Sequence, residues 1–193
     1  MENFEFYEKT QKALIPEKRY NHVLRVRDKA IELAKIYNAP IESVEIASYF
    51  HDLAKNFKDE DALNIIDDKY KYIFENGFNI NQILHGFAAA DYIKKNFNIT
   101  DEAILDAIRY HTIGRSNMTL IDKIVYLADA IEDGRDYPGV DEIRNLAKTS
   151  LEKAILLELD IKIKHLIDKE SLIHPNTIEL RNSLIKEVKW TKH

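Results

Sequence analysis

The residues best suited to chemistry in this chain are histidines and aspartates set among apolar neighbours. An adjacent pair, His51-Asp52, follows the largely apolar segment 46–50, and Asp129 stands inside the apolar run 124–131. Three further histidines lie on or beside apolar stretches in the same way: His22, His85 and His111. Burying a carboxylate in such a run is costly unless a positive group meets it, and a metal ion, an arginine or a lysine would do so.

Taken together, these residues favour a metal site. Taken singly, a histidine on an apolar face is more often a hydrogen-bonded core residue, and an aspartate in a helix is more often exposed or paired with a basic residue. Imidazole and carboxylate ligands without thiolate suit Fe, Mn, Zn, Ni or Co, and they fit Mg or Ca poorly. Successive helical residues point about 100° apart. His51 and Asp52 therefore either share one ion near a helix terminus or serve two ions, with Asp52 bridging. Two ions about 3.5–4 Å apart would clamp a phosphoryl group.

The elements that must position these residues are helices. Apolar residues recur at helical spacing and no alternating strand pattern appears, so the sequence predicts an all-α fold. Predicted helices cover about 17–37, 41–54, 58–68, 79–96, 120–132, 140–149 and 150–168, with a last helix from Pro175. A further helix runs to His111, with Thr100 as its N-cap and Gly114 as its stop.

Composition limits the class of protein. The chain has 193 residues, 45% of them apolar and 32% charged, with only 5 Gly and 4 Pro, which favours one compact domain over 1–193. A net charge of −5 disfavours DNA or RNA as a partner. The absence of cysteine excludes disulfides and thiolate metal sites. No signal peptide or membrane-spanning run is visible, so a cytoplasmic location with no membrane partner is the expectation.

Six blocks of sequence resemble the YqeK branch of the HD-domain phosphohydrolase superfamily, over about 18–181. They are Arg19-Tyr20-Asn21-His22-Val23, His51-Asp52-Leu53-Ala54-Lys55, His85-Gly86 and the segments 107–115, 122–129 and 138–144. The resemblance implies a helical HD core of about 18–133, with C-terminal helices of about 140–190 packed on it. It implies a symmetrical diadenosine tetraphosphate hydrolase that makes two ADP by attack of a metal-bridging hydroxide.

The resemblance also implies a dinuclear site, with iron expected and Mn, Co, Ni or Zn as alternatives. One ion would be held by His22, His51, Asp52 and Asp129, and the other by His85, His111 and the bridging Asp52. A homodimer remains open.

Other candidates are less constrained by the sequence. Lys55 would lie beside the metals on a continuing helix and contact the scissile phosphate or protonate the departing ADP; a solvated surface lysine is the alternative. Candidate substrate contacts, each with an ordinary structural alternative, are Arg115, Arg135, Arg144, His174 and Thr177. His165 and His193 are interpreted as surface residues.

Three other functions stay open at this point. The chain could be an HD phosphohydrolase for a nucleoside mono- or diphosphate or a cyclic dinucleotide. It could be a non-catalytic nucleotide-binding or partner-binding HD module, although six intact ligands argue against that. It could also be a metal-dependent oxygenase on the same scaffold.

Overall fold

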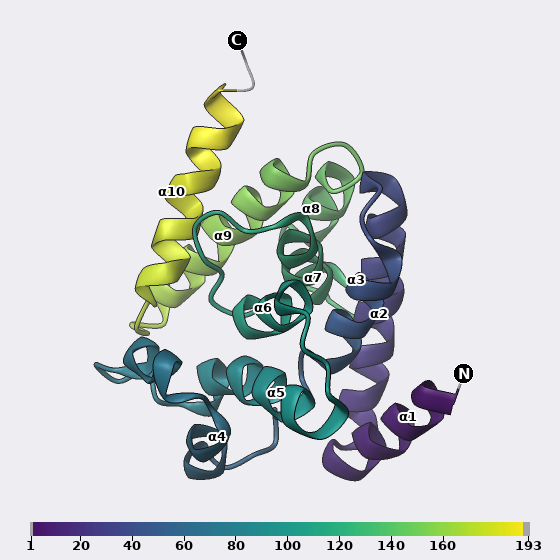
Figure 1. Ribbon diagram of the computed structural model, residues 1–193. Helices are drawn as coiled ribbons and strands as arrows, with labels where there is room; N and C mark the ends of the chain where they lie inside the picture. Colours follow the sequence, from purple (N-terminus) through teal and green to yellow (C-terminus); the bar gives the residue numbers. More distant parts are fainter. Residues whose placement is uncertain (1, 191–193) are drawn as a thin grey trace.

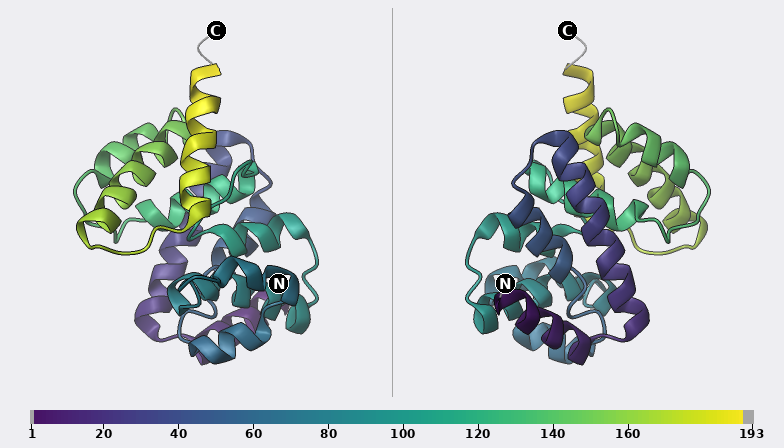
Figure 2. Two further views of the ribbon diagram at one scale, coloured as in Figure 1. Left: turned by 90° about the vertical axis from the view of Figure 1, so that its left-hand side faces the viewer. Right: turned by 90° about the vertical axis from the view of Figure 1, so that its right-hand side faces the viewer.

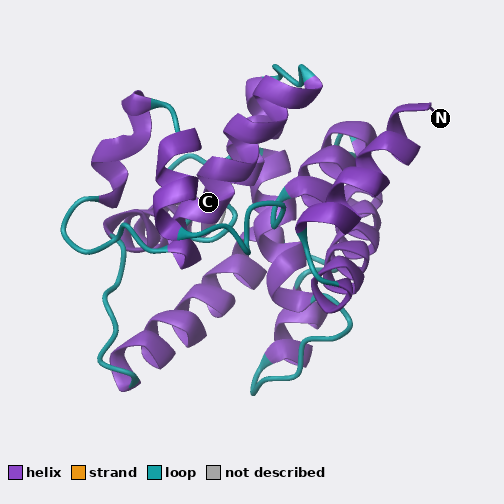
Figure 3. Ribbon diagram, turned by 90° about the horizontal axis from the view of Figure 1, so that it is seen from below, coloured by secondary structure: helices purple, strands orange, loops and turns teal. Residues whose placement is uncertain are grey.

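Helices make up all the regular secondary structure that the computed structural model describes, which covers residues 2–190 (Figures 1 and 3). The elements are α1 (Glu2–Leu14), α2 (Glu17–Tyr37), α3 (Ile41–Phe50), α4 (Asp59–Ile65), the 3₁₀ helix η1 (Asp68–Phe74), α5 (Asn81–Phe97), α6 (Glu102–Tyr110), α7 (Leu120–Ile131), α8 (Val140–Leu146), α9 (Leu151–Asp168) and α10 (Pro175–Trp190). The all-α prediction is confirmed. None of these helices is both long and apolar enough to span a bilayer.

Helix α7 lies at the centre of the packing. It contacts α2, α3, α6 and α9, and Ile124, Val125, Leu127 and Ala128 have no exposed surface (Figure 1). Burying a side chain such as Leu or Ile contributes roughly 1.5–3 kcal/mol. Packing of this kind explains why a helix carrying Asp129 is otherwise almost wholly apolar.

Local signals explain several helix ends. Thr119 and Asp122 form a capping box at the start of α7, in which each side chain accepts a hydrogen bond from the other's main-chain N–H. Asn38 ends α2 in the left-handed conformation, with φ 54°, which asparagine tolerates better than most residues. The N-cap of α6 is Asp101, whose side chain accepts from Ala103 N, so the prediction of Thr100 was wrong by one residue.

Other boundaries also differ from the predicted helices. Helix α1 was not among the predicted helices. Helix α3 ends at Phe50, and residues 51–56 form successive turns instead of a helix to Ala54. The predicted helix 58–68 is the shorter α4, followed by η1, and α8 ends at Leu146. His193 lies outside the described residues.

The C-terminal helices pack on the rest through α9. Helix α9 contacts α7, α8 and α10. Lys123 Nζ on α7 donates to Glu152 on α9 (3.0 Å) and Glu187 on α10 (2.7 Å), which ties the three helices together. Figure 2 shows α8, α9 and α10 grouped at the end of the molecule opposite α1 and α4.

Candidate metal centre and adjoining pocket

Five separate segments deliver the six predicted metal ligands to one place. Helices supply His22 from α2, His85 from α5 and Asp129 from α7. His111 is the C-cap residue of α6, and His51 and Asp52 occupy the turn after α3. The four imidazoles and Asp52 are at most 7% exposed. The end of α3 at Phe50 matters here, because the turn directs both members of the His-Asp pair into the cluster.

The carboxylate of Asp52 lies between two pairs of imidazoles. Its Oδ2 is 3.6 Å from Nε2 of both His22 and His51. Its Oδ1 is 3.1 Å from His85 Nε2 and 3.9 Å from His111 Nε2. One carboxylate therefore faces two separate sets of nitrogen donors, one with each oxygen.

Asp129 completes the first set. Its Oδ1 is 3.1 Å from His22 Nε2 and 4.0 Å from His51 Nε2. Ligand atoms of His22, His51 and Asp129 all lie within 4.8 Å of one another, as do those of His51, Asp52 and His111. Both groups are compatible with a metal ion.

In three of the four imidazoles, the hydrogen bond made by Nδ1 leaves Nε2 facing the cluster. Three histidines donate Nδ1–H to a main-chain carbonyl of the preceding turn: His51 to Ser48 (2.6 Å), His85 to Asn81 (2.8 Å) and His111 to Ile108 (2.7 Å). A carbonyl can only accept, so Nδ1 carries a proton and Nε2 is the nitrogen that faces the cluster. This is the arrangement of metal-ligating histidines.

Two of the four Nε2 atoms at the cluster form no hydrogen bond among the described residues. His22 Nε2 and His51 Nε2 are buried and unsatisfied among the described residues. An unsatisfied buried acceptor costs about 1–3 kcal/mol. A cation bound between His22, His51 and Asp129 would satisfy both nitrogens, so the residues present fit a metal.

Glu132 is a supporting residue that the sequence analysis missed. Its Oε1 lies 3.1 Å from His22 Nδ1, and its Oε2 accepts from Arg25 Nε at 2.5 Å. Burial raises the pKa of Glu132, but Arg25, the N–H of Gly134 and His22 outweigh it and lower the pKa to about 2. The available signal was its place three residues after Asp129, at the end of the same helix.

The charge states of the cluster suit metal binding. Burial lowers the pKa of His51 and, further, that of His111, which favours the neutral form of both rings. Burial raises the pKa of Asp52 and Asp129, but neighbouring imidazoles outweigh it, helped by Lys55 at Asp52 and by Arg135 at Asp129. Neutral imidazole and ionised carboxylate are the forms that ligate metals.

Three cations stand around these carboxylates. Lys55 Nζ is 3.3 Å from His85 Nε2 and 4.0 Å from Asp52 Oδ1, and burial lowers its pKa. Arg135 Nη2 contacts Asp129 Oδ1 at 2.5 Å. Arg19 Nη1 donates to Asp52 Oδ2 at 2.8 Å. Arg19 was not among the predicted site residues, although it opens the block that contains His22.

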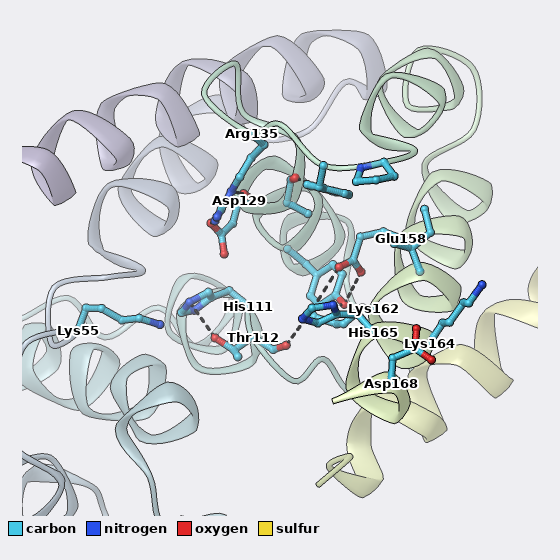
Figure 4. Close-up of a pocket in the computed structure, with 15 residues that line it drawn as sticks. Lys55, His111, Thr112, Asp129, Arg135, Glu158, Lys162, Lys164, His165 and Asp168 are labelled. Atoms are coloured by element: carbon cyan, nitrogen blue, oxygen red, sulfur yellow. Dashed lines mark hydrogen bonds and ion pairs between the residues drawn. The ribbon is translucent and has the colours of Figure 1, made fainter. Parts of the chain in front are cut away.

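A cavity of about 790 Å³ adjoins the cluster. Figure 4 shows Lys55, His111 and Asp129 toward one side of it and Glu158, Lys162 and His165 toward the other. It is lined by Lys55, His111, Thr112, Tyr126, Asp129, Ala130, Arg135, Tyr137, Pro138, Glu158, Ile161, Lys162, Lys164, His165 and Asp168. Predicted residues therefore supply one side of the cavity, and α9 supplies much of the other.

Four predicted substrate contacts lie elsewhere and hold the fold together. Arg115 pairs with Asp106 and Asp122, at 2.8 and 2.7 Å. The remaining three donate to main-chain carbonyls: Arg144 to Ile131, Glu132 and Arg135, Thr177 to Ile113, and His174 through Nε2 to Ile73. None of the four lines the large cavity. Their role in binding substrate stays a prediction that these contacts do not support.

Comparison with known proteins gives a consistent picture. Residues 19–134 match the HD domain family. A protein of Halalkalibacterium halodurans named symmetrical bis(5'-nucleosyl)-tetraphosphatase is 39% identical over 175 residues, which cover 91% of this chain and 93% of that protein. A protein of the same name from Staphylococcus aureus is 38% identical over 182 residues, covering 93% of each.

A solved structure is similar over almost its full length. It is the crystal structure of a protein from Clostridium acetobutylicum described as a predicted HD superfamily hydrolase involved in NAD metabolism. The TM-score is 0.86 at 41% sequence identity, with 95% of this chain and 97% of that chain covered.

Proposed function

The chain belongs to the HD domain family, whose members are hydrolases, and we propose that it cleaves diadenosine tetraphosphate symmetrically into two ADP. The family match covers residues 19–134, and all six candidate metal ligands lie within it. Relatives at 37–39% identity over most of the chain bear the name of this activity. Their names provide the substrate in this proposal, and the cluster provides the chemistry.

We further propose that the cluster holds two transition-metal ions, with iron as the first candidate. The observation that carries this proposal is the division of the Asp52 oxygens between His22 with His51 and His85 with His111. A carboxylate with two oxygens so placed is suited to bridging two cations. Asp129 would join the first ion.

The ions, when bound, lower the pKa of water and polarise phosphoryl oxygens, which is what hydrolysis of a phosphoanhydride needs. The protein residues then orient and neutralise the substrate. Arg135 stands beside Asp129 on the cavity wall, where its guanidinium can bind phosphate oxygens of the substrate. Lys55 lines the same cavity, and its Nζ can hold or protonate the phosphate oxygen of the departing ADP.

The first experiment is to quantify bound metals in the untagged protein and incubate it with diadenosine tetraphosphate, resolving products by chromatography. Two ADP per substrate, together with about two ions per chain, is the expected result. Asp52→Ala should lose both the ions and the activity, because Asp52 is the one residue of the described part of the chain whose carboxylate faces both sets of nitrogens. Asp160→Ala, an exposed carboxylate on α9 outside the cavity, is the matched control.

Other outcomes would redirect the proposal. ATP plus AMP would mean an asymmetric cut and a different placement of the substrate. Two bound metals without turnover would keep the metal site and discard this substrate, and nucleoside mono- and diphosphates and cyclic dinucleotides would then be assayed side by side.

A further inference from the structure

The cavity wall opposite the metal cluster comes from a part of the chain that the HD domain match does not reach. The match ends at residue 134, whereas Tyr137, Pro138, Ile161 and Lys162 all line the cavity. The cluster that would perform hydrolysis and the wall that faces it therefore come from different segments. A wall outside the shared core is a natural place for residues that select one substrate among phosphate compounds.

This wall is a built structure in which a loop and a helix are packed together. The loop after residue 134 meets α9 at Gly139, where an added Cβ would lie 2.6 Å from Ile161 Cδ1. Gly139 also has φ 95°, so both its conformation and the space around it favour glycine. Tyr137 Oη donates to Ala130 O on α7 at 3.0 Å, which anchors the aromatic ring beside the cavity.

Lys162 on α9 brings a cation into the cavity lining near the cluster. Lys162 Nζ donates to Tyr126 Oη at 2.9 Å and to Thr112 O at 3.2 Å, and it lies 3.4 Å from Glu158 Oε1. Thr112 directly follows the candidate ligand His111, and its Oγ1 is 3.1 Å from His111 Nε2. Lys162 is thus held at a fixed place in the cavity lining, next to Ile161 in sequence and bonded to the residue that follows His111.

We propose that this wall is the subsite for one nucleoside of the substrate, with the base against Tyr137, Pro138 and Ile161 and its attached phosphates beside Lys162. Ring and aliphatic groups suit an aromatic base, and a held ammonium group suits phosphate oxygens. The apolar groups and the ammonium group line one cavity together with His111 and Asp129, so one bound nucleotide can contact all of them. The inference rests on the proposed function, because it places the base of that substrate.

The test compares a nucleotide with a phosphate compound that has no base. Titration calorimetry of the metal-loaded protein would measure the Kd of ADP and the Kd of inorganic pyrophosphate. Ile161→Ala and Tyr137→Ala should each weaken ADP binding by roughly 5–10-fold, the size expected when one apolar contact is lost. Pyrophosphate binding should stay within about twofold of wild type. In steady-state assays the same variants should raise KM for diadenosine tetraphosphate more than they lower kcat.

Ile167→Ala is the matched control, because Ile167 is also on α9, is 61% exposed and does not line the cavity. Equal weakening of ADP and pyrophosphate in the two wall variants would overturn the subsite, since it would mean that they disturb the metal cluster. Unchanged ADP binding, or a wild type that binds pyrophosphate as tightly as ADP, would also overturn it. A wild type that selects ADP but does not cleave the dinucleotide would leave the subsite standing and refute the proposed activity.

Discussion

At the scale of single residues, a lysine lies very close to the candidate metal ligands. Lys55 Nζ lies 3.3 Å from one ring nitrogen of His85 and 3.5 Å from the other. The helix that was predicted to carry Lys55 is absent, and a hydrogen bond from Lys55 N to Asp52 O (3.0 Å) closes a tight turn there instead. The turn brings the ammonium group to the cavity even though the predicted element was wrong.

This placement predicts a selective effect on catalysis. Lys55→Ala should lower kcat for diadenosine tetraphosphate by roughly 100-fold, the size expected for loss of a proton donor or phosphate contact. The bound metal per chain should stay normal, because Lys55 is a cation and contributes no ligand. Steady-state kinetics and elemental analysis on the same preparation would check both statements, with Lys58→Ala on the exposed surface as the control. Unchanged kcat would remove Lys55 from the mechanism.

Glu132 leads to a different expectation, because it acts on a candidate ligand and not on the substrate. Glu132→Gln should weaken metal binding by about 10–100-fold, since a charged partner of His22 is lost and Arg25 loses its ion pair. Competition titration against a chelator would measure this change. Glu142→Gln, an exposed glutamate, should bind metal like the wild type. Equal metal affinity in both variants would mean that Glu132 serves the fold only.

At the scale of elements, the two helices that carry His85 and His111 touch at a glycine. A Cβ added to Gly86 on α5 would lie 2.7 Å from Ile108 O, 2.9 Å from Arg109 O and 3.1 Å from His111 Nδ1. The first two obstacles are main-chain atoms of α6 and cannot swing aside. Only glycine allows α5 and α6 to approach this closely, and the close approach brings His85 Nε2 and His111 Nε2 to 2.9 Å.

Gly86→Ala should therefore force α5 and α6 apart. We expect a loss of roughly 1–3 kcal/mol in the free energy of unfolding, which is typical of overpacking. Metal should be lost preferentially from the set formed by His85 and His111. Urea denaturation and metal counting would test this, with Lys95→Ala at an exposed position of α5 as the control. Full retention of both stability and metal would show that the helices can adjust.

The same helix pair predicts a pH dependence. Hydrogen bonds from Lys94 (2.9 Å) and Arg109 (2.8 Å) lower the pKa of Glu102 to about 2. A carboxyl group with a lowered folded-state pKa stabilises the fold above about pH 4.5, and this contribution is lost as pH falls toward 2. Glu102 is 51% exposed, so the contribution is below about 1 kcal/mol.

Thermal unfolding of wild type and Glu102→Gln between pH 6 and pH 2.5 would show this. The wild type should have the higher Tm near pH 6, and the difference should shrink on acidification, because the glutamine side chain of the variant cannot titrate. A difference that stays constant or grows at low pH would contradict the assignment.

The sequence predicted features that are set locally along the chain better than features that depend on contacts formed after folding. Helix α7 and the place of Asp129 in it were predictable, because an apolar run with one carboxylate is visible in the chain itself. Thr100 was mistaken for the N-cap because Thr100 and Asp101 are adjacent capping residues, and only the observed bond to Ala103 N distinguishes them. Arg115 and Arg144 were predicted as substrate contacts, and their ion pairs and main-chain hydrogen bonds could not be predicted because nothing in the sequence shows which acceptors an arginine meets after folding.

At the scale of the whole molecule, the C-terminal helices were predicted with His174 and Thr177 as their substrate contacts, whereas the cavity is lined from α9. His165 was interpreted as a surface residue; it is exposed, and it lines the cavity that faces the metal cluster. Which exposed face of α9 borders that cavity depends on how α9 crosses α7, which helical periodicity does not specify. We propose one domain over 1–193, because Lys123 joins α7 to both α9 and α10.

The stability of the whole fold should depend on the metal, because the cluster is costly without it. Two carboxylates and four buried imidazoles converge there, and two of the imidazole nitrogens lack a hydrogen-bond partner among the described residues. An ion that binds only the folded state at 100 times its Kd adds about 2.7 kcal/mol, which raises Tm by roughly 5–10 °C for a chain of this size.

Calorimetry of the chelated and reloaded protein would measure the shift. Asp52→Ala should lose most of it, since both sets of ligands share that carboxylate, whereas Asp160→Ala should keep it. An equal Tm with and without metal would mean that the cluster is satisfied by its own hydrogen bonds and ion pairs, and the proposed dinuclear site would then have to be abandoned.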